Sequence, residues 1–217
     1  MVSKMHAKTF SWNNPRLMSP AYLFGALRLG SNDILLESTM LGKHGRFSYI
    51  ALDPDTIIKS KGDYVLVDGI YQKINPLDAV KQKLIENIHI RPEGFPLFYG
   101  GAIGFMGYDL KNLMEPKLRT KTRLDTNFWD CYFIFPRVVI AFDAVEKKIF
   151  FSAKDNTKFD VGNLEKILNV WPSYKPDTHE QFLQQRNIAI NLSFEEYQKL
   201  FDRTKEYIYS GETYQLK

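Results

Sequence analysis

A carboxylate, a hydroxyl and a guanidinium group occur close together in two short strand-like stretches. Glu37 and Ser38 end the run Leu35-Leu-Glu-Ser, and Arg46 opens the run Arg46-Phe-Ser-Tyr-Ile. On rigid strands these groups could bind a small amino acid, because a carboxylate pairs with an ammonium group and a guanidinium with a carboxylate. The alternative is two ordinary strands of a sheet with one solvated glutamate, and spacing alone favours that alternative.

A second stretch, Gly100-Gly-Ala-Ile-Gly-Phe-Met-Gly-Tyr-Asp-Leu110, contains glycines at positions 101, 104 and 107. It has neither the G-x-G-x-x-G spacing of a dinucleotide site nor the G-K-[ST] ending of a phosphate-binding loop. We therefore expect these glycines to permit close backbone packing and a sharp turn, not to hold a phosphate.

No other pattern in the sequence specifies catalysis. The four histidines form no H-x-x-x-H or H-E-x-x-H pair and Cys131 is the only cysteine, so a zinc site is not expected. No G-x-S-x-G sequence provides a nucleophilic serine. Asp53, Asp55, Asp143 and Glu146 stand in turn-like sequences, where we expect solvated carboxylates. We predict no catalytic residue and no metal ligand in this chain.

Five segments carry helix signals. Ser19-Pro20 and Asn75-Pro76 each combine an N-cap with a proline at the first helical position. In the second of these helices we expect Leu77, Val80, Leu84 and Ile85 to point inward. Two further helices are predicted over Gly162–Trp171 and from Ser193 to Gly211, and Tyr108–Met114 is predicted to be a short helix or a turn.

Strand signals occur throughout the first 155 residues. The predicted strands are Asp33–Thr39, Arg46–Leu52, Thr56–Ser60, Asp63–Val67, Ile70–Ile74, Phe95–Phe105, Phe128–Phe142 and Lys148–Ala153. Asp53-Pro54-Asp55 is predicted to be a turn, Asp68-Gly69 a tight hairpin, and Pro136 a bulge or an edge position. Hairpins without regular strand–helix alternation indicate an α+β fold of mainly antiparallel, sandwich-like sheets with flanking helices.

The last segment reads as a helix followed by the start of a strand. Ser193 and Glu196 can form a capping box, and Gly211 suits the left-handed position after a helix. Residues 212–217 begin an extended segment inside which the sequence stops. We therefore expect the fold to be incomplete at the C-terminus, with the apolar face of this helix exposed, namely Tyr197, Leu200, Phe201 and Ile208.

Composition excludes several classes of protein. With 217 residues and 44% hydrophobic residues the chain can form a core, but no apolar run approaches the roughly 20 residues of a membrane span. The N-terminus lacks the apolar segment of a secretion signal, and a lone cysteine suits the reducing cytoplasm. The net charge of +4 comes from scattered lysines, so we expect no nucleic-acid partner.

Three motifs, in order, resemble the large components of chorismate-utilising synthases, the anthranilate and aminodeoxychorismate synthases. They are Leu35-Leu-Glu-Ser with Gly45-Arg-Phe-Ser, the glycine run that ends in Gly107-Tyr-Asp, and the pattern N-x-S-x-E-E-Y…G-E-x-Y-Q over residues 191–215. The resemblance implies an N-terminal domain over residues 1–171, a linker over 172–190 and the start of the chorismate-binding domain over 191–217.

The resemblance also implies a chemistry whose groups lie outside this chain. Such synthases bind Mg²⁺ through the carboxylate of chorismate and replace a ring hydroxyl with ammonia, which a glutamine amidotransferase subunit supplies. The family's metal ligands and acid–base groups fall beyond Lys217. The parent synthase is therefore expected to be an enzyme, while this isolated chain is expected to be inactive.

By the same resemblance, Leu36, Glu37, Ser38 and Arg46 are nominated as part of a feedback site for L-tryptophan. Thr213-Tyr-Gln favours the aminodeoxychorismate type, in the 4-aminobenzoate and folate pathway, whereas Leu35-Leu-Glu-Ser favours the anthranilate type, in the tryptophan pathway. A third hypothesis is a stand-alone, non-catalytic module that binds tryptophan or docks an amidotransferase.

Overall fold

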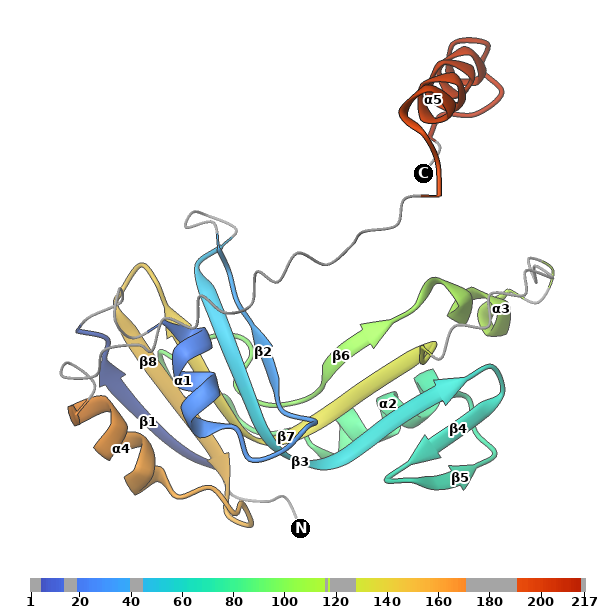
Figure 1. The fold of residues 1–217 in the computed structure, drawn as a ribbon. Coiled ribbons are helices and arrows are strands. Elements are labelled where there is room, and N and C mark those ends of the chain that lie inside the picture. The colour runs from blue at the N-terminus through green and yellow to red at the C-terminus, as the bar shows by residue number, and fades with distance from the viewer. Residues whose placement is uncertain are drawn as a thin grey trace. The chain divides into compact units, whose positions relative to one another are not determined.

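Two long antiparallel strands organise the structure, a computed structural model that describes residues 5–13, 19–39, 45–115, 117, 128–170 and 191–215 (Figure 1). The chain divides into two units, residues 1–175 and residues 176–217. Within the described residues, the first unit contains all the strands and four of the α-helices, and the second contains the last helix. The predicted linker lies outside the described residues, as do residues 40–44 between the first two motif strands.

The two long strands are β3 (Phe47–Lys61) and β7 (Cys131–Asp143), and we call them the central pair. They belong to an eight-stranded sheet in the order β1-β8-β7-β3-β4-β5, with β2 added to β3 and β6 added to β7. The other strands are β1 (Met5–Ser11), β2 (Ile34–Leu36), β4 (Tyr64–Val67), β5 (Ile70–Gln72), β6 (Ile103–Met106) and β8 (Lys148–Lys154).

Every pairing in this sheet is antiparallel, so the predicted mixture of helices with antiparallel strands is confirmed. The predicted sandwich is not confirmed, since the eight strands form one sheet. The hairpin at Asp68-Gly69 is confirmed, with φ of 52° and 82° at its two central residues. Positive φ at both positions matches the right-handed twist of the strands that the hairpin joins.

The predicted turn at Asp53-Pro54-Asp55 is wrong, because β3 continues through it. The register against β7 shifts between Pro54, opposite Pro136, and Thr56, opposite Phe135, so β3 carries one extra residue. Asp53 adopts φ of 52° there. A bulge was expected near Pro136 of β7, and the bulge lies opposite it on β3. Pro136 lies between the stretches of β7 that pair with β6 and with β8, where a missing N–H is tolerated.

The extra residue decides which face of the central pair each helix covers. Helices α1 (Pro20–Leu27) and α4 (Val161–Val170) pack with Leu52 and Val138, whereas α2 (Pro76–Glu86) packs with Ile58 and Phe135. Val138 and Phe135 are an odd number of residues apart on β7 and so lie on opposite faces. On β3 the bulge reverses the alternation between Leu52 and Ile58, so the helices cover opposite faces at the two ends.

The helix caps agree with the sequence, but the helix faces agree only in part. Ser19 Oγ accepts a hydrogen bond from Tyr22 N at 3.2 Å, and Asn75 Oδ1 accepts one from Leu77 N at 2.9 Å. Leu84 and Ile85, which were expected to point inward, are 40% and 60% exposed, because only the first turns of α2 pack on the sheet.

The segment before β6 also differs from the prediction. Strand structure begins only at Ile103, because Pro96 cannot donate to a ladder and Gly101, with φ of 106°, turns the chain. The short helical segment after the glycine run is confirmed as a 3₁₀ turn over Tyr108–Leu110 and α3 over Lys111–Met114.

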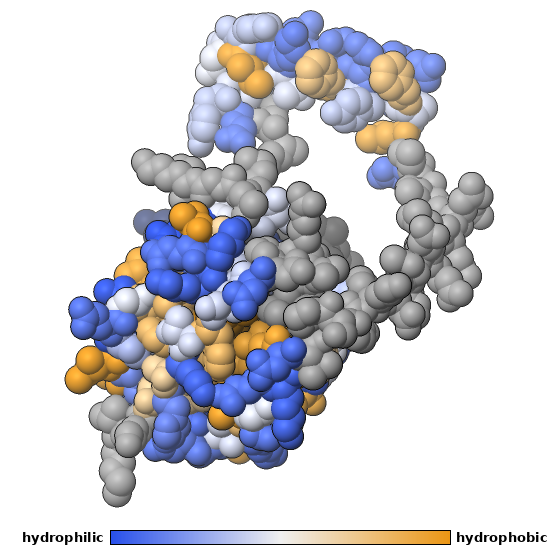
Figure 2. Space-filling model, turned by 90° about the vertical axis from the view of Figure 1, so that its left-hand side faces the viewer, coloured by the Kyte–Doolittle hydropathy of each residue, from blue (hydrophilic) through white to orange (hydrophobic). Residues whose placement is uncertain are grey.

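The second unit contains α5 (Phe194–Tyr209) with the predicted capping box. Glu196 N donates to Ser193 Oγ at 3.2 Å, and Ser193 N donates to Glu196 Oε2 at 2.8 Å. Gly211 has the predicted positive φ, 78°, but residues 212–215 form no strand. The apolar face is exposed, with Tyr197 at 58% and Leu200 at 52%, and Figure 2 shows apolar patches among hydrophilic residues on this helix.

Gly104 offers a direct test of the β6–β7 packing. A Cβ atom there would lie 1.9 Å from Tyr132 O, so Gly104→Ala must push β6 away from β7. We expect this substitution to lower the free energy of unfolding in urea by about 2–3 kcal/mol. The matched control is Gly25→Ala within α1, where nothing lies within 4 Å and helix propensity should add up to about 1 kcal/mol. Equal stabilities for the two variants would contradict the close approach.

Candidate functional site

The structure places the four predicted site residues at one end of the sheet, where Leu36 and Ser38 contact β3 and Arg46 leads into it. Leu36 is the last residue of β2 and is half-exposed, and its backbone pairs with that of Tyr49. Ser38 N donates to Ser48 Oγ at 3.0 Å, and Ser38 Oγ donates to Phe47 O at 2.8 Å. Ser38 is thereby held beside the start of β3, where Arg46 leads into the strand.

Glu37 takes no part in these contacts. It is exposed, and among the described residues no hydrogen bond or ion pair joins it to Ser38 or Arg46. The backbone therefore brings Leu36, Ser38 and Arg46 together but leaves the Glu37 carboxylate in solvent. Its role in an amino-acid pocket stays a prediction.

The Arg46 guanidinium is engaged by carboxylates of the protein itself. Nε lies 3.0 Å from both Asp143 oxygens, and Nη2 lies 2.6 Å from Asp143 Oδ2 and 2.8 Å from Glu146 Oε1. The guanidinium also lies 5.0 Å from the centre of the Phe47 ring. These contacts join the start of β3 to the hairpin between β7 and β8.

The prediction that Asp143 is a solvated turn residue is wrong, because it is the last residue of β7 and only 1% exposed. Its Oδ1 also accepts hydrogen bonds from Val145 N at 2.9 Å and Glu146 N at 3.1 Å, which stabilises the tight turn. Glu146 is exposed as expected, but it is paired with both Arg46 and Lys148.

Ionisation in this cluster follows from its hydrogen bonds. Burial alone would raise the pKa of the Asp143 carboxyl, but the hydrogen bonds from Arg46 and from the two backbone N–H groups outweigh burial and lower that pKa. The Asp143 hydrogen bond also raises the pKa of Arg46. Lys148, and then Arg46, lower the pKa of Glu146. Arg46 is therefore charged at neutral pH and paired with both Asp143 and Glu146.

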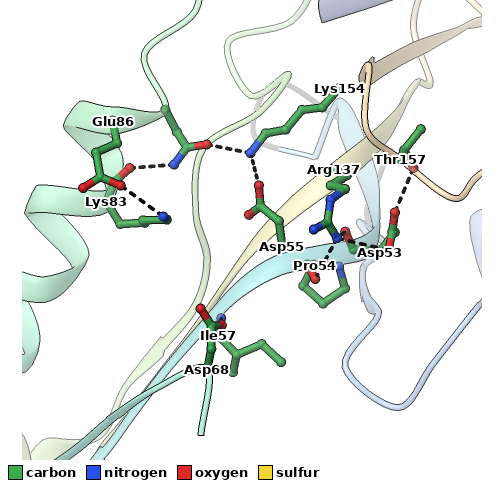
Figure 3. A network of polar contacts seen from close by, with 11 residues as sticks. Asp53, Pro54, Asp55, Ile57, Asp68, Lys83, Glu86, Arg137, Lys154 and Thr157 are labelled. Atoms are coloured by element: carbon green, nitrogen blue, oxygen red, sulfur yellow. Dashed lines mark hydrogen bonds and ion pairs between the residues drawn. The ribbon is translucent and has the colours of Figure 1, made fainter. Parts of the chain in front are cut away.

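A second polar cluster, the bulge network, surrounds the bulge in β3 (Figure 3). Lys154, the last residue of β8, is 4% exposed, and its Nζ lies 2.7 Å from Asp55 Oδ2 and 2.6 Å from Asn87 Oδ1. Asn87 follows α2, and its Nδ2 donates to Lys83 O at 2.8 Å. One buried ammonium group thus joins β8, the bulge and the end of α2.

Asp53 makes the other half of the bulge network. Its carboxylate accepts hydrogen bonds from Thr157 Oγ1 at 2.9 Å, Lys158 N at 2.9 Å and Arg137 Nη1 at 3.3 Å. Arg137 Nη1 also donates to Pro54 O at 3.2 Å, inside the bulge. The prediction that Asp53 and Asp55 are solvated turn carboxylates is therefore wrong, since both carboxylates are largely buried and paired.

The backbone of Asp53 extends the network to the α1–β2 connection. Asp53 N donates to Asp33 Oδ1 at 3.0 Å, while Asp33 Oδ2 accepts hydrogen bonds from Leu29 N and Gly30 N at 2.5 and 2.8 Å. Sequence reasoning missed these partners, because they are separated along the chain by up to about a hundred residues. The one local signal was two aspartates flanking a proline.

Two observations concern the possible chemistry of the described residues. No cluster of three or more His, Cys, Asp or Glu side chains among them could hold a metal ion. Burial, and then the charge of Asp130, raise the pKa of the Cys131 thiol to about 11, so it stays protonated and weakly nucleophilic. No helix in the described part is long and apolar enough to cross a membrane.

A cavity of about 450 Å³ lies at the end of β5 beside the start of α2. Its lining residues are Asp63, Tyr71, Lys73, Ile74, Asn75, Pro76 and Leu113. None of the predicted site residues contributes to it. It is therefore separate from the end of the sheet where Ser38 and Arg46 lie.

Comparison with known proteins assigns the chain to a family. The model of a family described as chorismate binding enzyme matches residues 33–217. Anthranilate synthase component 1 of Aquifex aeolicus is 27% identical over 86% of this chain and 41% of its own length. Aminodeoxychorismate synthase component 1 of Bacillus subtilis is 26% identical over 84% of this chain and 40% of its own length.

One solved structure, anthranilate synthase component I from Streptococcus pneumoniae, superposes with a TM-score of 0.49 and 22% identity, covering 95% of this chain and 46% of that one. The chain thus spans somewhat less than half the length of these relatives.

The bulge network predicts a large effect of Lys154→Met. The substitution leaves the Asp55 carboxylate without its cation, so we expect a loss of about 3–5 kcal/mol in the free energy of unfolding. The double variant Lys154→Met/Asp55→Leu should lose less, since no charge is then left unpaired. The control is Lys148→Met, which breaks only an exposed pair and should have a small effect. Additive losses from the two single substitutions in a double-mutant cycle would contradict a coupled pair.

The Arg46–Asp143 pair predicts a dependence of stability on pH. Because the folded-state pKa of Asp143 is lowered, its contribution is present above the unfolded-state pKa of about 3.9 and is lost as the pH falls through the folded-state pKa. Asp143→Asn should destabilise the protein by about 1–3 kcal/mol at pH 7 and show a shallower loss of stability in acid.

The pH dependence is measured by urea unfolding between pH 7 and pH 3. Glu93→Gln serves as the control, because Glu93 is an exposed carboxylate outside the Arg46–Asp143 cluster. Identical acid profiles for wild type and Asp143→Asn would show that this carboxylate does not have a lowered pKa.

Proposed function

The chain belongs to the family of chorismate binding enzymes, and from that premise we propose that it is the N-terminal part of a synthase component that aminates chorismate. The observation that carries the proposal is the match over residues 33–217, together with relatives more than twice as long in both branches of the family. We favour the aminodeoxychorismate branch, with 4-aminobenzoate and folate as the pathway.

A specific observation favours the second candidate, an anthranilate synthase component in tryptophan biosynthesis. Leu35-Leu-Glu-Ser is the element that resembles the feedback site of those enzymes, and relatives named anthranilate synthase component 1 are 24–28% identical over most of the chain. Thr213-Tyr-Gln supports the first candidate. The product of the reaction distinguishes the two.

In either synthase, we propose that these residues act as a scaffold. The bulge network holds the extra residue of β3 in place. The Arg46–Asp143 pair holds the start of β3, beside which Ser38 lies. Mg²⁺ would supply a positive charge for the chorismate carboxylate, but the described residues offer no cluster that could hold it. From the family resemblance we propose that its ligands, and the acid–base groups, lie outside this chain.

The proposed partners follow from the same assignment. Ammonia would come from a glutamine amidotransferase subunit, and L-tryptophan would be the ligand of the predicted pocket at Leu36, Glu37, Ser38 and Arg46. Since Arg46 is already paired with two carboxylates, a tryptophan carboxylate would have to compete with Asp143 and Glu146 for it. Ser38 and Glu37 would then supply more of the recognition than Arg46.

Calorimetry with L-tryptophan tests the predicted pocket. Binding in the micromolar range that Ser38→Ala weakens at least tenfold is the expected result, because the substitution removes a hydroxyl group held beside β3. Ser31→Ala, at an exposed serine outside the pocket, is the matched control. No heat at millimolar tryptophan would remove the pocket, and with it the tryptophan-binding form of the non-catalytic module, while leaving the synthase assignment in place.

Activity measurements test the synthase assignment itself. Purified 217-residue chain given chorismate, Mg²⁺ and ammonium should form neither anthranilate nor aminodeoxychorismate above the rate without protein. Sustained conversion would contradict the proposal that the reacting groups lie elsewhere. Protein expressed from the gene with the sequence that follows codon 217, supplied with ammonium, should form aminodeoxychorismate. Anthranilate would establish the second candidate, and an unrelated downstream sequence would favour the stand-alone module.

A further inference from the structure

We draw no further inference here: the strongest candidate, the exposed apolar face of α5 around Tyr197 and Leu200, carries nothing because nothing in the structure shows what covers it.

Discussion

One extra residue in β3, opposite a proline in β7, is the constraint on which the arrangement of the first unit depends. Side chains alternate between faces with a period of two, so an insertion or deletion of one residue moves every following side chain to the other face. The bulge lets β3 present Leu52 to α1 and α4 at one end and Ile58 to α2 on the opposite face at the other. Without the bulge, either the apolar core around Leu52 or the one around Ile58 would lose its contribution from β3.

Buried charges hold that bulge in place. An ionised side chain is expensive to bury unless it is paired and hydrogen-bonded. Lys154 is paired with Asp55 Oδ2 and hydrogen-bonded to Asn87, whereas Asp55 Oδ1 is buried without a hydrogen-bond partner among the described residues. Because such a pair contributes more to fixing one geometry than to net stability, we infer that the network specifies the position of the bulge. Asp53 adds a left-handed backbone conformation, which aspartate tolerates better than most residues.

The pairing of charged side chains also bears on what the described residues can do chemically. Arg46 is paired with Asp143, and Lys154 is paired with Asp55. These contacts, and a length below half that of the relatives, support the scaffold role proposed for the chain.

The sequence by itself determined the features that depend on neighbours along the chain. The caps at Ser19, Asn75 and Ser193, the Asp68-Gly69 hairpin and the close approach at Gly104 are set by residues within a few positions or by the absence of a side chain. Family membership also followed from local motifs, and the family's match over residues 33–217 confirmed it.

Only the tertiary structure decided which polar residues are buried and which apolar residues are not. Asp53 and Asp143 look like turn residues locally, but Thr157 and Arg46, about a hundred residues away in the chain, complete their hydrogen bonds. Leu84 and Ile85 have helical spacing suited to a core, but the sheet beneath α2 does not reach them. Local pattern fixes the conformation of a segment, whereas burial depends on what the rest of the chain brings against it.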